Sequence, residues 1–249
     1  MSHHVIEFID TSYNYPDGNM GVVNANLRIQ HGESVAIIGA NGAGKSTLLK
    51  LLVGIMLPKK GEIRLGDIPV TPKTMSIIRQ RIGFTFQEPE DQLFNATVYD
   101  DVAFGPRNYG LEEKEVEKRV LRAAQTVGIG HLLQRAPYKL SGGEKRAASI
   151  ATVLSLEPDV LAMDEPTAAL DPKSRRKLIQ LLQGFEHTKI IATHDLDLAL
   201  ELCSRTVVLK DGTVVYDGPT VDIMHNSQLL EDCGLEQPLT LQGCNSCMK

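Results

Sequence analysis

A glycine-rich segment near residue 40 carries the strongest chemical signal in the sequence. Residues 39–46 read Gly-Ala-Asn-Gly-Ala-Gly-Lys-Ser, which fits the pattern G-x-x-x-x-G-K-[ST]. The glycines let backbone amides converge on a phosphate, the lysine adds a positive charge, and the serine hydroxyl can hold Mg²⁺. The segment therefore predicts a nucleotide-phosphate loop, whose binding residues are Gly39, Asn41, Gly42, Ala43, Gly44, Lys45, Ser46 and Thr47.

Two adjacent carboxylates end an apolar run further along the chain. Residues 160–165 read Val-Leu-Ala-Met-Asp-Glu, which is typical of a buried strand with an acidic end. Asp164 can reach a Mg²⁺ ion held by Ser46, and Glu165 can polarise a water for attack on a γ-phosphate. Alone, the pattern is more often that of a solvated strand end. Together with the phosphate loop, it predicts metal binding by Asp164 and general-base catalysis by Glu165.

A third motif, Leu-Ser-Gly-Gly-Glu at residues 140–144, opens an expected helix. Ser141 and Glu144 have the spacing of a capping box, which a helix start needs for structural reasons alone. Gly142 and Gly143 are not required by such a box, and two adjacent glycines lower helix stability. Because they also expose amides at a helix N-terminus, we interpret Ser141, Gly142 and Gly143 as an anion-binding start.

Alternating strands and helices must position these motifs. Period-two or wholly apolar patterns predict strands at residues 5–9, 23–29, 35–38, 82–86, 160–163, 189–193, 205–209 and 213–216. Apolar stripes and stop signals predict helices at residues 45–53, 112–127, 141–156, 172–182 and 196–202. The fold class is therefore α/β: a P-loop NTPase core with a mostly parallel sheet, an N-terminal antiparallel β subdomain, and an α-helical subdomain inserted at about residues 88–157.

Composition excludes several classes of protein. The chain of 249 residues carries 26 Lys and Arg against 31 Asp and Glu, a formal net charge of −5. This acidic balance argues against a broad electrostatic grip on nucleic acid. The sequence has no apolar run of the roughly 18 to 20 residues that a membrane helix needs. Four cysteines are too few for a disulfide scaffold and fit a reducing, cytoplasmic setting.

The motifs occur together in the order and spacing of the ABC-transporter ATPases, and the chain resembles that family to about residue 225, which leaves 226–249 as a C-terminal tail. The resemblance implies binding and hydrolysis of ATP with Mg²⁺. It assigns Gln87 to Mg²⁺ and the attacking water, and His194 to the γ-phosphate. It assigns adenine stacking to an aromatic residue near the N-terminus, for which the spacing to the phosphate loop favours Tyr15 over Tyr13.

The same resemblance implies an ATP-dependent homodimer. The 141–143 helix start, with Ser141 and Gly143, would close over ATP held by the other protomer. Residues 169–171 would form the loop that crosses the dimer. Asp171 also reads locally as a helix N-cap, with Pro172 at the first helical position.

Residues 86–106 narrow the resemblance to the ATPase subunits of energy-coupling-factor transporters, in particular cobalt and nickel importers. This implies a peripheral place on the cytoplasmic face of the cell membrane, with an integral membrane coupling subunit and a substrate-binding membrane component as partners. Leu93 and Phe94 suit a docking site if exposed; ordinary packing is the alternative for each. A vitamin importer of the same type, another ABC importer and a soluble mechanical ABC ATPase remain as alternative functions.

The cysteines call for separate interpretation. Cys203 falls on the apolar face of an expected helix, which indicates a core position. Cys233, Cys244 and Cys247 lie in the polar C-terminal tail. Their thiols could bind a soft metal, with a frayed tail carrying free thiols as the favoured interpretation.

Overall fold

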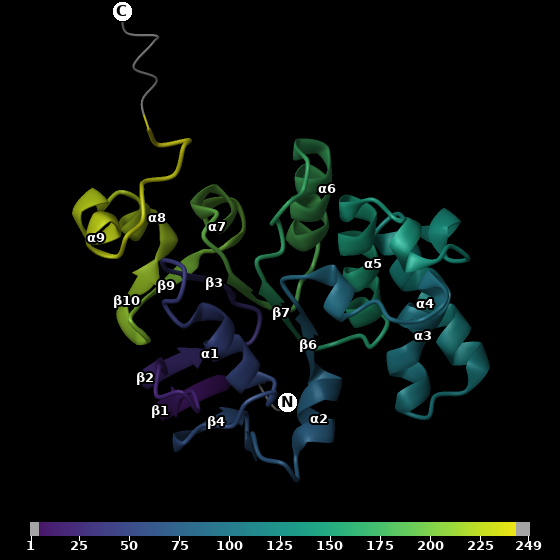
Figure 1. The fold of residues 1–249 in the computed structure, drawn as a ribbon, viewed down its shortest axis with the longest axis horizontal. Coiled ribbons are helices and arrows are strands. Elements are labelled where there is room, and N and C mark those ends of the chain that lie inside the picture. The colour runs from purple at the N-terminus through teal and green to yellow at the C-terminus, as the bar shows by residue number, and fades with distance from the viewer. Residues whose placement is uncertain (1–4, 243–249) are drawn as a thin grey trace, which may run out of the picture. The chain divides into compact units, whose positions relative to one another are not determined.

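The computed structural model describes residues 5–242, which fall into two compact units (Figure 1). The first takes its described residues from Met1–Ile78 and Thr188–Lys249, and the second is Arg79–His187. The expected inserted helices lie in the second unit, which is wider than residues 88–157 because it also holds strands and a further helix. Among the described residues, no helix is long and apolar enough to cross a bilayer.

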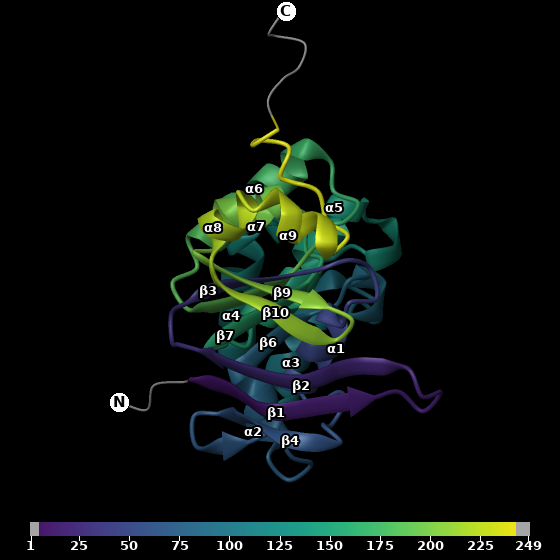
Figure 2. The same ribbon diagram turned by 90° about the vertical axis from the view of Figure 1, so that its left-hand side faces the viewer.

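The first unit contains two groups of paired strands (Figure 2). An antiparallel sheet has the order β2-β1-β4-β5, and the other group has the order β10-β9-β3-β8, in which β3 pairs in parallel with β8 and β9. The strands are β1 (Ile6–Asn14), β2 (Met20–Ile29), β3 (Ser34–Ile38), β4 (Lys60–Leu65), β5 (Ile68–Pro69), β8 (Thr188–Ala192), β9 (Arg205–Lys210) and β10 (Thr213–Pro219). The N-terminal antiparallel sheet and the parallel pairing are both as predicted.

Local sequence explains several of these elements. Along β2, buried and exposed positions alternate from Asn24 onward, as the period-two pattern predicts. Val35 to Ile38 in β3 are all buried, which suits a parallel strand covered on both faces. Between β9 and β10, Asp211 and Gly212 both adopt positive φ, 48° and 78°. Two positive φ angles define the turn type that Asp-Gly favours in hairpins.

The helices of the first unit pack around these strands. They are α1 (Lys45–Leu52), α7 (Leu196–Leu202), α8 (Thr220–Met224) and α9 (Ser227–Asp232), and α2 (Met75–Arg81) runs across the sequence boundary between the units. The tail expected from residue 226 differs from prediction, because residues 226–235 fold and bury Leu230 and Cys233. Burial raises the pKa of both the Cys233 thiol and the Cys203 thiol, the latter to about 12. Cys244 and Cys247 lie outside the described residues.

The second unit consists of helices beside a short parallel strand pair. Its elements are β6 (Ile82–Thr85), α3 (Val98–Asn108), α4 (Glu113–Thr126), α5 (Gly142–Leu154), β7 (Val160–Asp164) and α6 (Pro172–Gln183), with short 3-10 turns at Pro89–Asp91, Gly130–Leu132 and Pro137–Lys139. In Figure 1, α3, α4 and α5 lie against one another. As predicted, no strand interrupts the described chain between β6 and β7.

Apolar side chains from all three helices form the core of this unit. Val102, Val116, Val120 and Ala148 are fully buried within it. Leu93 belongs to the same core, with only 9% of its surface exposed, whereas Phe94 is 62% exposed. Of the two alternatives for these neighbours, packing therefore holds for Leu93 and exposure holds for Phe94.

A proline inside α3 is accommodated by a long-range hydrogen bond. Pro106 has no amide proton, so it cannot donate to the carbonyl of Val102 one turn earlier. The hydroxyl of Ser155 donates to that carbonyl at 2.8 Å instead. The buried acceptor is thereby satisfied, and α3 continues to Asn108.

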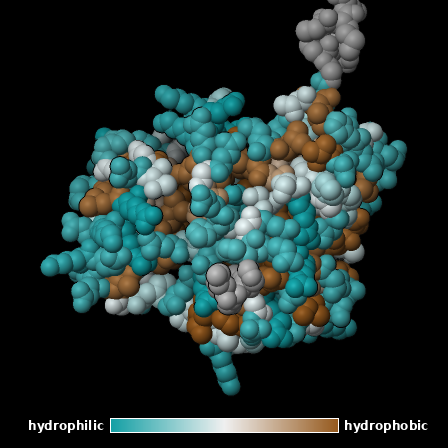
Figure 3. All heavy atoms as spheres, turned by 180° about the vertical axis from the view of Figure 1, so that it is seen from behind, coloured by the Kyte–Doolittle hydropathy of each residue, from teal (hydrophilic) through white to brown (hydrophobic). Residues whose placement is uncertain are grey.

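On the face seen in Figure 3, hydrophilic residues predominate and hydrophobic ones form small separate patches. Scattered exposed apolar residues are usual for folded proteins.

Candidate nucleotide-binding site

The glycine-rich segment forms a loop between β3 and α1 in the first unit. Gly44 is the N-cap of α1 and has a φ of 104°, in the left-handed region. A Cβ at Gly44 would lie only 2.3 Å from the carbonyl oxygen of Gly21, so no side chain fits there. Gly42 also has a positive φ, 82°, but no atom lies within 4 Å of where its Cβ would be. The loop therefore needs glycine at one position for packing and at the other for backbone conformation.

Lys45 lies inside this loop. Its ammonium group donates to the carbonyls of Gly39 at 2.8 Å and Ala40 at 3.2 Å, and only 6% of the residue is exposed. The first amides of α1 have no earlier carbonyl within the helix to which they could donate. A positive charge beside such amides forms a site for phosphate oxygens.

Tyr15 is attached to this loop through Thr47. Its hydroxyl and that of Thr47 lie 2.7 Å apart, and the ring of Tyr13 packs edge-on against Tyr15 with centroids 5.2 Å apart. Tyr15 thus contacts the phosphate-loop helix by a direct hydrogen bond. This placement agrees with its assignment as the adenine-stacking residue, which stays a prediction.

His194 follows β8, the neighbour of the strand that leads into the phosphate loop. Ala36 and Ile37 of β3 lie opposite Ile191 and Ala192 of β8 in a parallel register. Because parallel strands end at the same edge, the exposed His194 and the phosphate loop start from adjacent strand ends. Asp195, which caps α7 by accepting from the Leu198 amide at 2.9 Å, fixes the chain direction after the histidine.

The predicted carboxylates lie in the second unit at the end of β7. Asp164 and Glu165 are 3% and 5% exposed. Glu165 has a φ of 47° and Ala169 has a φ of 58°, in a region that side chains other than glycine rarely adopt. Such backbone strain concentrates at functional sites.

Gln87 follows the strand next to these carboxylates. Thr85, the last residue of β6, lies opposite Met163 of the parallel strand β7. Gln87, which is exposed, and Asp164 therefore both start from this edge of the pair. Gln87, Asp164 and Glu165 thus start from one edge of the β6–β7 pair, whereas Ser46 belongs to the first unit.

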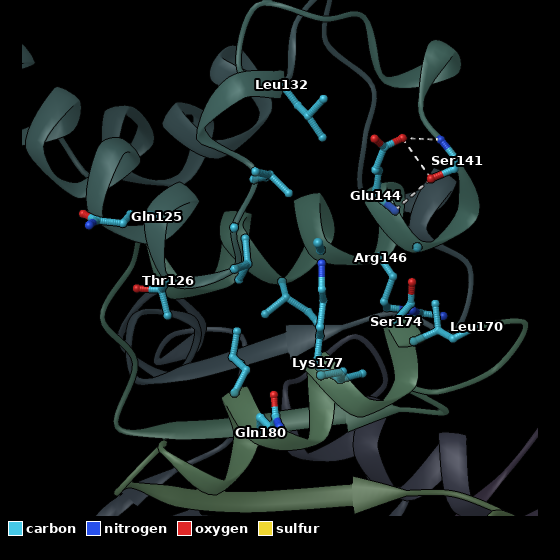
Figure 4. A pocket seen from close by; sticks show the side chains of 18 of the residues that line it. Gln125, Thr126, Leu132, Ser141, Glu144, Arg146, Leu170, Ser174, Lys177 and Gln180 are labelled. Atoms are coloured by element: carbon cyan, nitrogen blue, oxygen red, sulfur yellow. Dashed lines mark hydrogen bonds between the residues drawn. The ribbon is translucent and has the colours of Figure 1, made fainter. Parts of the chain in front are cut away.

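The capping box predicted at residue 141 is present at the start of α5 (Figure 4). The amide and hydroxyl of Ser141 each donate to the Glu144 carboxylate at 2.8 Å, which lowers the pKa of Glu144. The amide of Glu144 lies 3.4 Å from the Ser141 hydroxyl oxygen. Ser141 and Gly142 remain exposed, so the start of α5 can be approached by a ligand.

Gly143 differs from Gly142 in its surroundings. A Cβ at Gly143 would lie 2.6 Å from the hydroxyl oxygen of Ser174, whereas nothing lies within 4 Å of one at Gly142. Ser174 in turn donates to Asp171 at 2.6 Å, and Asp171 caps α6 as predicted. The hydrogen bond from Ser174 lowers the pKa of the Asp171 carboxyl. A side chain at 143 would therefore displace the Ser174 hydroxyl from Asp171, a packing constraint that the sequence pattern did not predict.

A pocket of about 600 Å³ opens beside this helix start. Ser141, Glu144 and Arg146 of the α5 region line one part of it, and Ser174 and Lys177 of α6 line another. In Figure 4 the Lys177 side chain points from α6 into this space. All its lining residues belong to the second unit, so it contains none of the phosphate loop.

The residues predicted for Mg²⁺ suit that ion chemically. A serine hydroxyl (Ser46), a carboxamide oxygen (Gln87) and a carboxylate (Asp164) are all hard oxygen donors, which Mg²⁺ prefers. Within residues 5–242, no group of three or more His, Cys, Asp or Glu forms an alternative metal centre. By donor chemistry alone, these three side chains fit Mg²⁺.

Comparison with known proteins identifies the family. The ABC transporter domain matches residues 22–168. A Geobacter sulfurreducens protein named as an ABC transporter ATP-binding protein is 55% identical over 99% of both chains. The energy-coupling factor transporter ATP-binding protein of Methanothermobacter thermautotrophicus is 40% identical, over 95% of this chain and 78% of that protein.

Solved structures agree with this result. CbiO1 of Clostridium perfringens, described as part of the ABC transporter complex CbiONQ, has a TM-score of 0.80 at 38% identity, covering 92% of this chain and 94% of that one. The dimeric ATP-binding cassette MJ0796, bound to ADP and phosphate after hydrolysis, has a TM-score of 0.79 at 28% identity, covering 86% and 98%. With the family domain matching more than half of the chain and the phosphate loop in place, this protein belongs to the ABC transporter ATPases.

Proposed function

We propose that this chain is the ATP-hydrolysing subunit of an energy-coupling-factor importer, and that the importer takes up a transition-metal ion, cobalt or nickel. The ATPase activity follows from the family. The transporter type is supported by the relatives named as energy-coupling factor and CbiO proteins. The metal substrate rests on the resemblance of residues 86–106 to the cobalt and nickel importers.

In this proposal, the chemistry is divided among the described residues. Lys45 and the α1 amides bind the phosphates, and Tyr15 stacks on the adenine. Glu165 accepts a proton from the attacking water, which Gln87 contacts, and His194 contacts the γ-phosphate. Ser46, Gln87 and Asp164 would hold Mg²⁺, which would supply positive charge beside the phosphates.

The protein acts as a homodimer, with Ser141 and Gly143 completing the site of the partner. The phosphate loop, Glu165 and the 141–143 helix start are all intact in one chain, so two identical protomers can carry two working sites. The dimeric relative bound to ADP and phosphate supports this arrangement.

ATP turnover per chain should rise with protein concentration and level off when dimers saturate. The reason is that half of each site is supplied in trans. Steady-state phosphate release over a hundredfold range of protein concentration measures this, with Lys45→Ala as the variant that should neither bind ATP well nor dimerise with it. Constant turnover from a demonstrated monomer would contradict the dimer.

An exposed pair of aromatic side chains supports the proposed docking to a membrane partner. Phe94 and Phe104 are 62% and 44% exposed, and their rings meet edge-on with centroids 4.9 Å apart. Asp101, which is buried, accepts from the amides of Phe94 at 3.0 Å and Asn95 at 2.9 Å. The pair is therefore held on a fixed backbone, as a docking site for an apolar helix requires.

Replacing both Phe94 and Phe104 by Ala should weaken capture of the membrane coupling subunit. Loss of a buried interface anchor costs about 2 kcal/mol or more, which is roughly 30-fold in affinity. ATPase activity of the isolated chain should stay within a few fold, because neither ring belongs to the core. A pull-down with the coupling subunit in detergent, beside an ATPase assay and thermal unfolding, measures this separation.

Two variants control this experiment. Leu121→Ala removes another exposed apolar side chain from the same unit and should leave capture unchanged. Leu93→Ala should instead lower the free energy of unfolding by about 2–5 kcal/mol, since Leu93 is in the core. Unchanged capture by the Phe94→Ala, Phe104→Ala variant would remove the docking role.

The substrate is tested by uptake with the complete transporter. Proteoliposomes holding this chain and its membrane partners should accumulate radioactive cobalt or nickel when ATP is enclosed. Uptake of a vitamin in place of the metals would assign the alternative substrate class.

A further inference from the structure

A buried arginine joins the Gln87 segment to the helix that begins at Ser141. Arg146 lies on the first turns of α5 and is only 3% exposed. One terminal nitrogen donates to the carbonyl of Phe86 at 2.8 Å, and the other donates to the carbonyl of Gln87. Its guanidinium therefore forms hydrogen bonds with two consecutive peptide groups of the segment that carries Gln87.

Gln92 links the same segment to α5 a second time. The amide of Phe86 donates to the Gln92 side-chain oxygen at 3.3 Å. The Gln92 side-chain nitrogen donates to the carbonyl of Ser149 at 3.0 Å and to the hydroxyl of Thr152 at 2.7 Å, both on α5. The backbone around Phe86 and Gln87 is thus tied to α5 at two levels of the helix.

Arg146 is a buried charged group whose hydrogen-bond acceptors are two neutral backbone carbonyls. Burial lowers the pKa of its guanidinium, and the carboxylates of Glu88, Glu90 and Asp164 oppose that shift. Its Nε has no hydrogen-bond partner among residues 5–242. Burying a charge is costly unless it makes several strong contacts. A neutral side chain could fill this space at a lower cost in free energy. The planar guanidinium, with its two hydrogen bonds, therefore points to a role in positioning the Phe86 and Gln87 backbone.

We propose that Arg146 is a positioning residue that makes Gln87 and the 141–143 helix start move as one body. This rests on the proposed function, in which Gln87 faces ATP of its own protomer and Ser141 faces ATP of the partner. When ATP draws the partner toward Ser141, α5 carries Arg146 with it, and the Gln87 peptide follows. Gln87 therefore reaches its working position only when the partner has closed.

A neighbouring contact supplies a matched control. Lys145 of α5 forms an ion pair with Glu90 at 2.6 Å, which links the same helix to the same segment. The two side chains are 22% and 57% exposed, so this pair is screened by water and contributes little. Lys145→Ala therefore removes the ion pair between α5 and this segment but leaves the Arg146 hydrogen bonds to the Gln87 backbone in place.

Hydrogen exchange of the nucleotide-free protein tests whether the Arg146 hydrogen bonds hold the backbone of this segment in place. Arg146→Ala should speed exchange of amides in residues 86–92 about tenfold or more, since their anchored carbonyls are released, while Lys145→Ala should change it less than twofold. Arg146→Lys, which can satisfy one carbonyl, should fall between. Equal exchange in Arg146→Ala and wild type would overturn the proposal whether or not the chain drives transport.

ATPase kinetics test the consequence for Gln87. Arg146→Ala should lower kcat about tenfold while ATP affinity stays within threefold, and Lys145→Ala should leave both within twofold. Combining Arg146→Ala with Gln87→Ala should cost no more than Gln87→Ala alone, because Arg146 acts through Gln87. Fully additive losses would show an independent effect and reject the positioning role. Should Arg146→Ala fail to fold, Arg146→Lys in the same cycle decides the question.

Discussion

Glu165→Gln should reduce ATP turnover by about 10² to 10⁴-fold, the range expected for loss of a positioned general base. The substitution keeps the size and most contacts of a residue that is only 5% exposed, so the fold should persist. ATP binding should survive as well, because the phosphate loop is untouched. Closed dimers with ATP should then accumulate, visible by size-exclusion chromatography alongside phosphate-release kinetics.

Glu157→Gln is the matched control for this variant. Glu157 is a second glutamate with a left-handed backbone, φ 53° against 47° for Glu165. It forms ion pairs with Arg119 and Arg122 at the surface. Its neutralisation should leave turnover within about twofold, since exposed pairs contribute little. Wild-type turnover by Glu165→Gln would show that another group takes the proton.

The parts of the fold that sequence could predict are those fixed by local chemistry. The Asp211-Gly212 turn, the Ser141–Glu144 box and the Asp171 cap each depend on residues at most a few positions apart, and all are present. Motif residues at strand ends were predictable for the same reason, because short apolar runs mark parallel strands.

Elements that depend on distant partners escaped prediction. The segment Lys60–Leu65 carries charged residues and a glycine, yet it forms β4 because Ile63 pairs with Phe8 of β1. Helix α3 contains Gly105 and Pro106, which disfavour helix, and its Val102 carbonyl is satisfied from Ser155. No local sequence pattern predicts the β1–β4 pairing or the hydrogen bond from Ser155.

In the candidate site, too, residues in local motifs were predictable and residues with distant partners were not. Lys45 and Glu165 were predictable from their motifs, but Arg146 was not, because its partners Phe86 and Gln87 are some 60 positions away and offer only backbone carbonyls. The buried Asp101 is similar. It accepts from the backbone amides of Phe94 and Asn95, and no helix was predicted around it, so no local signal marked its role.

Gly142→Asp should abolish hydrolysis by the dimer while leaving ATP binding to the isolated chain nearly unchanged. Nothing lies within 4 Å of a Cβ at this position, so the variant should fold without strain. The new carboxylate would stand at the exposed start of α5, where we place the partner's γ-phosphate. Two like charges about 4 Å apart repel by about 4 kcal/mol at an effective dielectric constant of 20, which is roughly a thousandfold in rate.

Gly142→Asn separates charge from size in this experiment, because it has nearly the same shape and no charge. Turnover should fall at least tenfold further in Gly142→Asp than in Gly142→Asn if a phosphate approaches this helix start. Gly143 is less suitable for the test, because a Cβ there lies 2.6 Å from the Ser174 hydroxyl and would displace it. Phosphate release at saturating protein, with ATP affinity measured by equilibrium dialysis, gives both quantities. Equal turnover in the two variants would mean that steric bulk alone matters, and that no anion binds at the start of α5.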